Sequence, residues 1–289
     1  MQTDNNPYDI LDPEIIKLTN TCGIRYLRNI IFRIILDHPE MYDSVNDMLI
    51  EAHSNQDNDK VNALLSDAKF PCYPDHYRLT DFDPVCLSEN DAATYQKLTH
   101  LEFLSSESKA NVFIHGLIGQ GREKVAIGLG DACCRQQQKT FYITYSDLIG
   151  ILRTHCTDSK NNEKYSDLVG MNVLVIDNFA EDNVYDEEIL DNLKSFLDSR
   201  ALMHHNNFVA HKYGKELFKP CCTIITSAFE PAEWTQYMKQ DNRKTLSISR
   251  LFHEKYAFSI HVDELNIPVD KANTDEKNAA LNEKQPDKS

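Results

Sequence analysis

A glycine-rich segment at residues 116–123 has the residue spacing of a loop that binds phosphate. Gly116 and Gly121 occupy the two glycine positions of the pattern GxxxxGK(S/T). An apolar run, Asn111–His115, precedes the segment, and a helix predicted over Lys124–Gln138 follows it. In a strand–loop–helix arrangement of this kind, main-chain N–H groups and the helix N-terminus surround phosphate oxygens. The residues expected to contact a nucleotide are Gly116, Gly119, Gln120, Gly121, Arg122 and Glu123.

Two side chains of this loop depart from the pattern. Arg122 replaces the lysine that contacts terminal phosphates; it keeps the positive charge, but its guanidinium is larger and planar. Glu123 replaces the hydroxyl that ligates Mg²⁺, and its carboxylate would repel phosphate by roughly 1–4 kcal/mol at effective dielectric constants of about 80 to 20. Mg²⁺ would offset part of this repulsion if Glu123 ligated it directly. Lys124 does not replace the missing lysine, because it lies about 200° around the helix from Arg122.

A second motif has the form of a Walker B strand. The apolar run Val173–Asp177 ends in an aspartate of the kind that holds Mg²⁺. The next residue is Asn178, at the position where many ATPases carry a glutamate that activates water, and an amide cannot act as a general base. Each motif alone also fits a structural element, either a turn or a buried strand with a solvent-facing aspartate. Together they favour a nucleotide site, with Asp177 and Asn178 at catalytic positions and Asp177 and Glu123 as candidate metal ligands.

The second half of the sequence predicts an α/β fold. Short apolar runs alternate with helical patterns, which indicates a parallel sheet flanked by helices. One such helix opens with Asp186, Glu187 and Glu188, acidic residues that suit a helix N-terminus. The predicted strands are Asn111–His115, Thr140–Thr144, Asn172–Asp177, Cys222–Thr226 and Tyr256–His261.

The N-terminal region has a different pattern. Apolar residues from Leu27 to Ile35 recur at helical spacing, and Pro39 lies just beyond them. Two further helices are predicted around Asp43–His53 and Lys60–Ala68. Prolines at positions 71 and 74, followed by an extended stretch at residues 79–84, then mark a junction with the α/β region.

Composition limits the functions that remain. The formal net charge of −15 opposes unaided binding to nucleic acid, because that affinity comes from Lys and Arg, although a local basic face stays open. The eight cysteines show no CxxC spacing, so no zinc or redox motif is indicated. No apolar run approaches the roughly 20 residues of a membrane span. The first twelve residues lack the features of a signal peptide, so we expect a cytoplasmic protein.

Beyond the two Walker motifs, the chain resembles the IstB/DnaC-like family of AAA+ proteins, which includes transposase helper ATPases and bacterial helicase loaders. Residues 68–71 and 79–83 resemble the lead-in to the ATPase domain of this family. Residues 223–227, with Glu233 and Trp234 after them, resemble its sensor 1 segment. Residues 249–253 resemble the segment that supplies an arginine to a neighbouring subunit's nucleotide, which would make Arg250 a catalytic residue.

Several departures from the family accompany this resemblance. The polar sensor residue of the family falls on Ala228, residues 262–265 replace its Gly-Ser-x-Arg-like end, and residues 204–219 form an insertion. The loop lysine, the loop hydroxyl, the catalytic glutamate and the sensor are thus all altered, whereas Asp177 and Arg250 remain. Losses within one catalytic unit are not additive, so after the first loss the others are tolerated. The pattern therefore predicts a domain freed from ATP hydrolysis.

The resemblance implies three regions and a set of partners. We expect a helical partner-binding region at residues 1–67, a P-loop AAA+-like domain at residues 68–262, and a disordered polar tail at residues 263–289. The implied cofactor is ATP with Mg²⁺, the implied protein partner is a transposase or a replicative helicase, and the implied contact with DNA is through a homo-oligomer.

Two functions stay open at this point. One is an ATP-binding accessory protein in DNA transposition or replication, including helicase loading, with weak or no hydrolysis. The other is a pseudo-ATPase that serves as a protein-interaction module without nucleotide. A small-molecule kinase with a P-loop is less well supported, because it would need the same missing lysine and the sequence offers no acceptor motif.

Overall fold

The computed structural model describes residues 28–71, 77–79, 87–119, 121–181, 187–215, 217–234 and 242–262. By its internal contacts the chain divides into two compact units, Met1–Ser66 and Asp67–Ser289. Gln120, most of the predicted extended stretch at residues 79–84, and the predicted disordered tail at residues 263–289 lie outside the described residues. Within the described part, no helix combines the length and the apolar character needed to cross a membrane.

The described part of the first unit is helical. Helix α2 (Arg28–Asp37) leads through the short 3-10 helix η3 (Pro39–Met41) into α3 (Tyr42–Asp67). The prediction of two separate helices over residues 43–53 and 60–68 was wrong, because α3 runs through both without a break. Residues 54–59 contain no glycine or proline, and the Asp57 carboxylate lies 3.2 Å from both His53 Nδ1 and Lys60 Nζ. These pairs within one helix face support the polar middle of α3.

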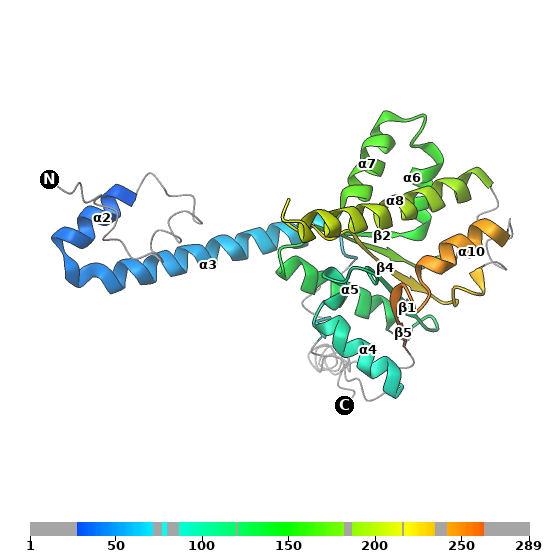
Figure 1. The fold of residues 1–289 in the computed structure, drawn as a ribbon, viewed down its shortest axis with the longest axis horizontal. Coiled ribbons are helices and arrows are strands. Elements are labelled where there is room, and N and C mark those ends of the chain that lie inside the picture. Colours follow the sequence, from blue (N-terminus) through cyan, green and yellow to red (C-terminus); the bar gives the residue numbers. More distant parts are fainter. Residues whose placement is uncertain are drawn as a thin grey trace, which may run out of the picture. The chain divides into compact units, whose positions relative to one another are not determined.

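A five-stranded parallel sheet with strand order β2-β3-β4-β1-β5 forms the centre of the second unit. All five predicted strands are confirmed, and no predicted end is wrong by more than one residue. In Figure 1 the sheet runs through the middle of this unit. The strands are β1 (Asn111–His115), β2 (Thr140–Thr144), β3 (Val173–Asp177), β4 (Cys222–Ser227) and β5 (Ala257–His261).

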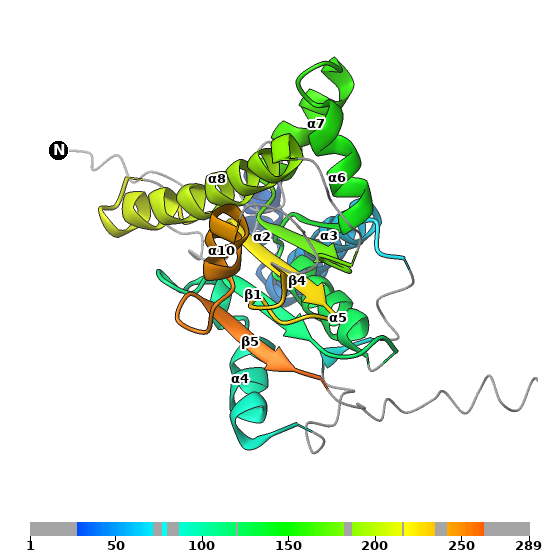
Figure 2. The ribbon, with the colours of Figure 1, turned by 90° about the vertical axis from the view of Figure 1, so that its right-hand side faces the viewer.

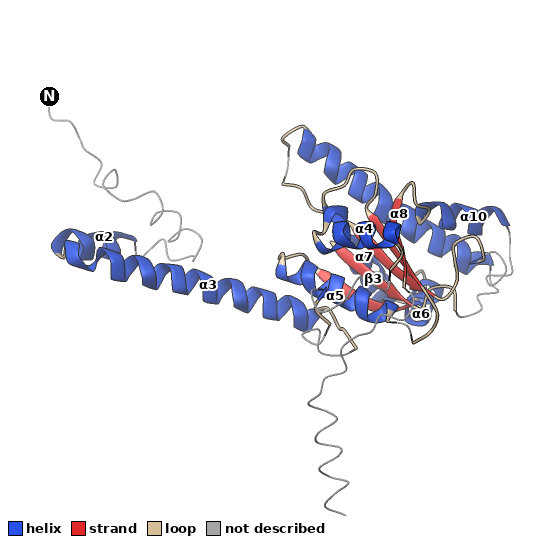
Figure 3. Cartoon of the chain, turned by 90° about the horizontal axis from the view of Figure 1, so that it is seen from below, coloured by secondary structure: helices blue, strands red, loops and turns tan. Residues whose placement is uncertain are grey.

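Helices cover both faces of this sheet, which confirms the predicted fold class (Figures 2 and 3). Val112 and Ile114 of β1 pack with α4 (Glu89–Thr99) and α5 (Arg122–Arg135) on one face. Phe113, between them, faces the opposite layer, as the alternation of side chains along a strand requires. That layer contains α6 (Tyr145–Thr154), α7 (Ser159–Gly170), α8 (Glu187–Lys212) and α10 (Asn242–Leu251).

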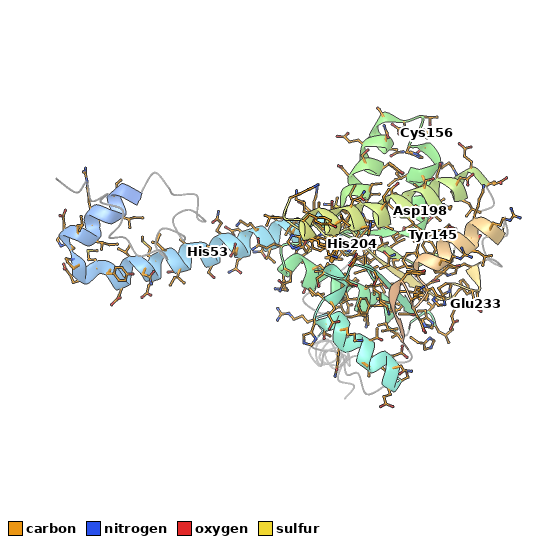
Figure 4. All side chains as sticks on the ribbon, viewed as in Figure 1. His53, Tyr145, Cys156, Asp198, His204 and Glu233 are labelled. Atoms are coloured by element: carbon orange, nitrogen blue, oxygen red, sulfur yellow. The ribbon has the colours of Figure 1, made fainter. Side chains whose placement is uncertain are left out.

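Side chains fill the space between the sheet and these helices (Figure 4). Trp234 is fully buried, and its ring contacts the rings of Phe113, Phe179 and Phe252. Its indole N–H lies 3.3 Å from Ser227 Oγ, so the tryptophan predicted to follow the fourth strand holds the end of that strand.

A buried arginine fixes the opposite end of the sheet. The Arg200 side chain lies on α8 at 1% exposure, and no carboxylate among the described residues pairs with it. Its guanidinium donates instead to the carbonyls of Leu168 (2.6 Å) and Met171 (3.1 Å) and to the Thr223 hydroxyl (3.0 Å). The carbonyls at the C-terminus of α7 carry partial negative charge and so compensate part of the cation. Burial nevertheless lowers the pKa of Arg200.

Candidate functional site

The strand order brings the two predicted motifs together. β4 lies between β1 and β3, so the loop that follows β1 and the aspartate that ends β3 flank the carboxyl end of β4. Gly116 donates its N–H to the Ser227 carbonyl at 3.3 Å, and Asn178 donates its N–H to the Thr226 hydroxyl at 3.0 Å. The end of β4 therefore ties the glycine loop to the residue after Asp177. A crevice at the carboxyl ends of parallel strands is the usual ligand position in such sheets.

The main chain of the loop keeps the features of an anion site. Gly119 and Gly121 have φ values of 88° and 96°, a conformation that strains any residue with a side chain. Gly121 is also the N-cap of α5, and it supplies no side-chain hydrogen bond to the first turn of the helix. N–H groups at an uncapped helix N-terminus attract anions. Leu117 and Ile118, at the tip, are exposed.

Arg122 points back into the protein. Its side chain is only 5% exposed, and Nη1 donates to the Gly116 carbonyl at 2.8 Å. Nη2 donates to Asn178 Oδ1 at 2.8 Å and forms an ion pair with the Glu181 carboxylate. The guanidinium is thus neutralised within the chain and is not a free cation above the loop. Burial raises the pKa of Glu181, and the charge of Arg122 offsets part of that increase.

The carboxylate of Asp177 is already hydrogen-bonded on both oxygens. Tyr142 donates its hydroxyl to Oδ2 at 2.7 Å, Asn178 donates Nδ2 to the same oxygen at 3.1 Å, and Thr226 donates its hydroxyl to Oδ1. A carboxylate offers about four acceptor positions, so about one remains. Among the described residues, no group of three or more His, Cys, Asp and Glu could hold a metal ion. The remaining position would allow Asp177 one contact with a metal ion, and Mg²⁺ held there would take its other ligands from phosphate oxygens and water.

Arg122, Asp177, Asn178 and Glu181 form one hydrogen-bond network. Glu123 lies in the first turn of α5, next to this network. Partial burial raises its pKa, and the negative charge of Asp177 raises it further, while the Tyr142 hydroxyl and the charges of Arg122 and Lys124 offset part of the effect. The ionised form of the Glu123 carboxyl is thus already disfavoured before any phosphate binds. The Lys124 ammonium lies 5.4 Å from the centre of the Tyr77 ring, as its predicted position away from the loop requires.

Asn178 joins the two halves of the network. Its amide oxygen accepts from Arg122 and its amide nitrogen donates to Asp177, an orientation that matches both partners. Its φ of 57° lies in the left-handed region that asparagine tolerates better than most residues. A glutamate here would place another carboxylate beside Asp177 and Glu181 and would present only acceptors.

Not every predicted residue belongs to this cluster. Arg250 is exposed in the last turn of α10, and no described contact joins it to the loop or to Asp177. Ala228, the predicted sensor position, takes part only through its main-chain N–H, which lies 3.0 Å from Glu181 Oε1.

Sequence reasoning missed three residues of the cluster. Tyr142 lies in the middle of β2 and Thr226 near the carboxyl end of β4, the two strands that flank β3, and no short sequence pattern indicated either of them. Glu181 follows Asp177 by four positions, and the only signal for it was an acid in the turn after the second motif.

A parallel sheet with helices on both faces, a glycine loop leading into a helix and an aspartate ending a neighbouring strand define a P-loop domain of the AAA+ type. The family model of the IstB-like ATP binding protein matches residues 37–267, and this chain belongs to that family. An ATP-binding protein of insertion sequence IS5376 from Geobacillus stearothermophilus is 25% identical over 202 residues, which cover 69% of this chain and 70% of the relative.

Three solved structures show partial similarity to the chain. The AMPPCP-bound DnaA from Aquifex aeolicus has a TM-score of 0.48 and 17% identity, over 70% of this chain and 56% of DnaA, so the chain spans little more than half of that protein. The DnaI structure has a TM-score of 0.49 and 15% identity, over 67% of this chain and 95% of DnaI. The DnaC helicase loader has a TM-score of 0.44 and 13% identity, over 65% of this chain and 97% of DnaC.

Proposed function

We propose that this chain is an accessory protein of DNA transposition or replication, including helicase loading, whose AAA+ domain binds ATP weakly and does not hydrolyse it. Membership of the IstB-like family supports the setting, and a relative is described as the ATP-binding protein of an insertion sequence. The observation that carries the proposal is the hydrogen-bond network in which Asn178 binds both Arg122 and Asp177.

The network engages the side chains on which hydrolysis would depend. Phosphoryl transfer depends on positive charge and Mg²⁺ at the phosphates and on a residue that positions or activates water. The cation of Arg122 is paired with Glu181, and the carboxylate of Asp177 already accepts from three side chains. Asn178 offers no base. The main chain of the loop and the N-terminus of α5 still provide N–H groups for phosphate, so weak binding remains.

We expect the purified full-length protein to release phosphate from ATP at or near the background rate. The matched control is Asp177→Ala, which removes the one carboxylate that both Walker B chemistry and the network share. Phosphate release is measured for both proteins with excess ATP and Mg²⁺. A wild-type turnover of about 1 s⁻¹, ordinary for an enzyme, that disappears in Asp177→Ala would reject the proposal.

A second candidate is a protein-interaction module that needs no nucleotide. The ion pair between the buried Arg122 and the partly buried Glu181 favours it, because the cation that would meet phosphate is already compensated. Equilibrium binding of labelled ATP, with and without Mg²⁺, separates the two functions. Saturable binding supports the first candidate, and the absence of measurable binding supports the second.

We also propose that the first unit binds the protein partner, a transposase or a replicative helicase. Four large apolar side chains of α2 and α3 are about half exposed: Ile30, Leu36, Met48 and Ile50. Exposed large apolar side chains are the groups that a protein partner would cover. In the full-length protein, Met48→Asp with Ile50→Asp should weaken binding of the partner by about tenfold or more. Leu202→Asp, at an equally exposed position in the other unit, is the control; equal affinity for both variants would contradict the assignment.

A further inference from the structure

The C-terminal half of α8 and the segment after it differ in charge from the rest of the chain. We call residues 204–219 the α8 arm; they coincide with the insertion found in the sequence. The full sequence has 45 acidic and 30 basic residues, yet residues 199–229 contain three lysines, one arginine and three histidines against a single acid, Glu216. A strongly acidic protein therefore has a local basic stretch.

The α8 arm is a helix end followed by a return segment. Gly214, with φ of 67°, ends the helix, and its N–H lies 2.8 Å from the His211 carbonyl. Phe218 of the return segment packs against the rings of Phe208 and His204, with centroid distances of 5.7 and 5.5 Å. Asn207 adds a hydrogen bond of 2.8 Å to the Lys219 carbonyl. The arm therefore holds its exposed residues in a fixed arrangement.

His204, labelled in Figure 4, anchors the arm from inside. It is 2% exposed, and its Nε2 lies 2.8 Å from the Ser106 carbonyl. Its Nδ1 accepts the Cys221 N–H at 3.2 Å, so Nε2 carries the hydrogen and the ring is neutral. Burial lowers the pKa of this histidine, in agreement with a neutral ring. His204 therefore has a structural role and carries no charge, and the positive charge of the arm comes from its exposed lysines.

The exposed residues of the arm include three lysines and one tyrosine within eight positions of the sequence. Lys212, Lys215 and Lys219 are exposed, and none of them pairs with a carboxylate among the described residues. Tyr213, between the first two, is 71% exposed. Figures 2 and 3 show this end of α8 running beyond the sheet, where it is accessible. Stabilisation of the helix dipole accounts for Lys212 alone, because Lys215 and Lys219 lie past the end of the helix.

We propose that the α8 arm is a DNA-binding element that contacts the phosphate backbone through Lys212, Lys215 and Lys219, with Tyr213 available to stack on a base. The proposal rests on the proposed role in DNA transposition or replication. Lysine is a point charge on a flexible stem, so these contacts position the protein and do not read sequence. Exposed lysines bind the phosphates of a nucleic acid, and an exposed aromatic ring near them in the sequence can stack on a base.

The test is the affinity of the full-length protein for labelled DNA of about 30 residues, single- or double-stranded, between about 50 and 200 mM salt. Fluorescence anisotropy compares the wild type with the triple variant Lys212→Ala, Lys215→Ala, Lys219→Ala. We expect the affinity to fall at least about tenfold at the low-salt end. The slope of log affinity against log salt should become shallower by about 2–3, as the loss of three phosphate contacts requires. Preference for one form of DNA identifies which form the arm binds.

The matched control changes the same charge elsewhere: Lys97→Ala, Lys139→Ala, Lys160→Ala, all exposed lysines. Its affinity should stay within about threefold of the wild type. The proposal is overturned if both triple variants weaken equally, or if the wild type does not bind DNA at the lowest salt. Displacement of the DNA by polyglutamate at equal charge concentration would point to an acidic protein instead and would also overturn it. ATP hydrolysis by the wild type would reject the proposed function while leaving this result unchanged.

Discussion

Replacing Arg200 by methionine is expected to lower the free energy of unfolding by about 3–5 kcal/mol. The guanidinium satisfies carbonyls of the α7 C-terminus, the Thr223 hydroxyl and the Cys222 carbonyl at the start of β4. Without it, several buried acceptors lose their donor, and each unsatisfied buried group costs about 1–3 kcal/mol. Because a whole domain is stable by only about 5–15 kcal/mol, the loss should be large enough to lower the Tm of the second unit by many degrees.

Urea unfolding followed by circular dichroism gives the free energy directly. Arg153→Met, at an exposed position on α6, is the matched control and should change stability by no more than about 0.5 kcal/mol. Arg200→Lys keeps the charge but presents fewer donors and no planar fork, so it should lie between the wild type and Arg200→Met. If Arg200→Met and Arg153→Met unfold at the same urea concentration, the hydrogen bonds of Arg200 do not stabilise the second unit as expected.

Glu123→Thr is expected to tighten ATP binding by about 5- to 150-fold, which corresponds to about 1–3 kcal/mol. The substitution removes a carboxylate beside the loop and restores a hydroxyl. Arg122→Lys should give a smaller gain, because it also deprives Glu181 and Asn178 of the guanidinium that they share. Neither variant should hydrolyse ATP, since Asn178 supplies no base.

The pH dependence of binding identifies Glu123 as the cause. Its pKa is already raised, and a bound phosphate would raise it further, so ATP binding is coupled to proton uptake. Wild-type affinity should therefore increase as pH falls from neutral toward that pKa, and Glu123→Thr should remove the part of the increase that the carboxylate causes. Titrations of labelled ATP at several pH values measure both effects. An identical pH profile in the two proteins would contradict the assignment.

The strands were predictable because each is a local pattern. β3 is buried at all five positions, and a strand buried on both faces of a parallel sheet appears in the sequence as an unbroken apolar run. The polar middle of α3 carries no apolar periodicity, so the sequence showed two helices where the chain forms one. The glycine loop and Asp177 were likewise local patterns.

The partners of Asp177 were not predictable in the same way. Tyr142 and Thr226 reach its carboxylate because β2 and β4 flank β3, and that strand order is not set by any short segment. The direction of Arg122 depends on the turn after β3, in which Asn178 and Ala180 both adopt positive φ and bring Glu181 back toward the loop. The sequence showed a retained positive charge, but only the turn conformation determines what that charge binds.

The network around Arg122 also limits which single substitutions this sequence tolerates. Lysine at position 122 alone would weaken the ion pair with the partly buried Glu181, and glutamate at position 178 alone would place like charges beside Asp177. Each single substitution is therefore expected to be less stable than the present sequence, since residues in one network are energetically coupled. Positions 122 and 178 are therefore best changed together, because each residue is a hydrogen-bond partner of the other.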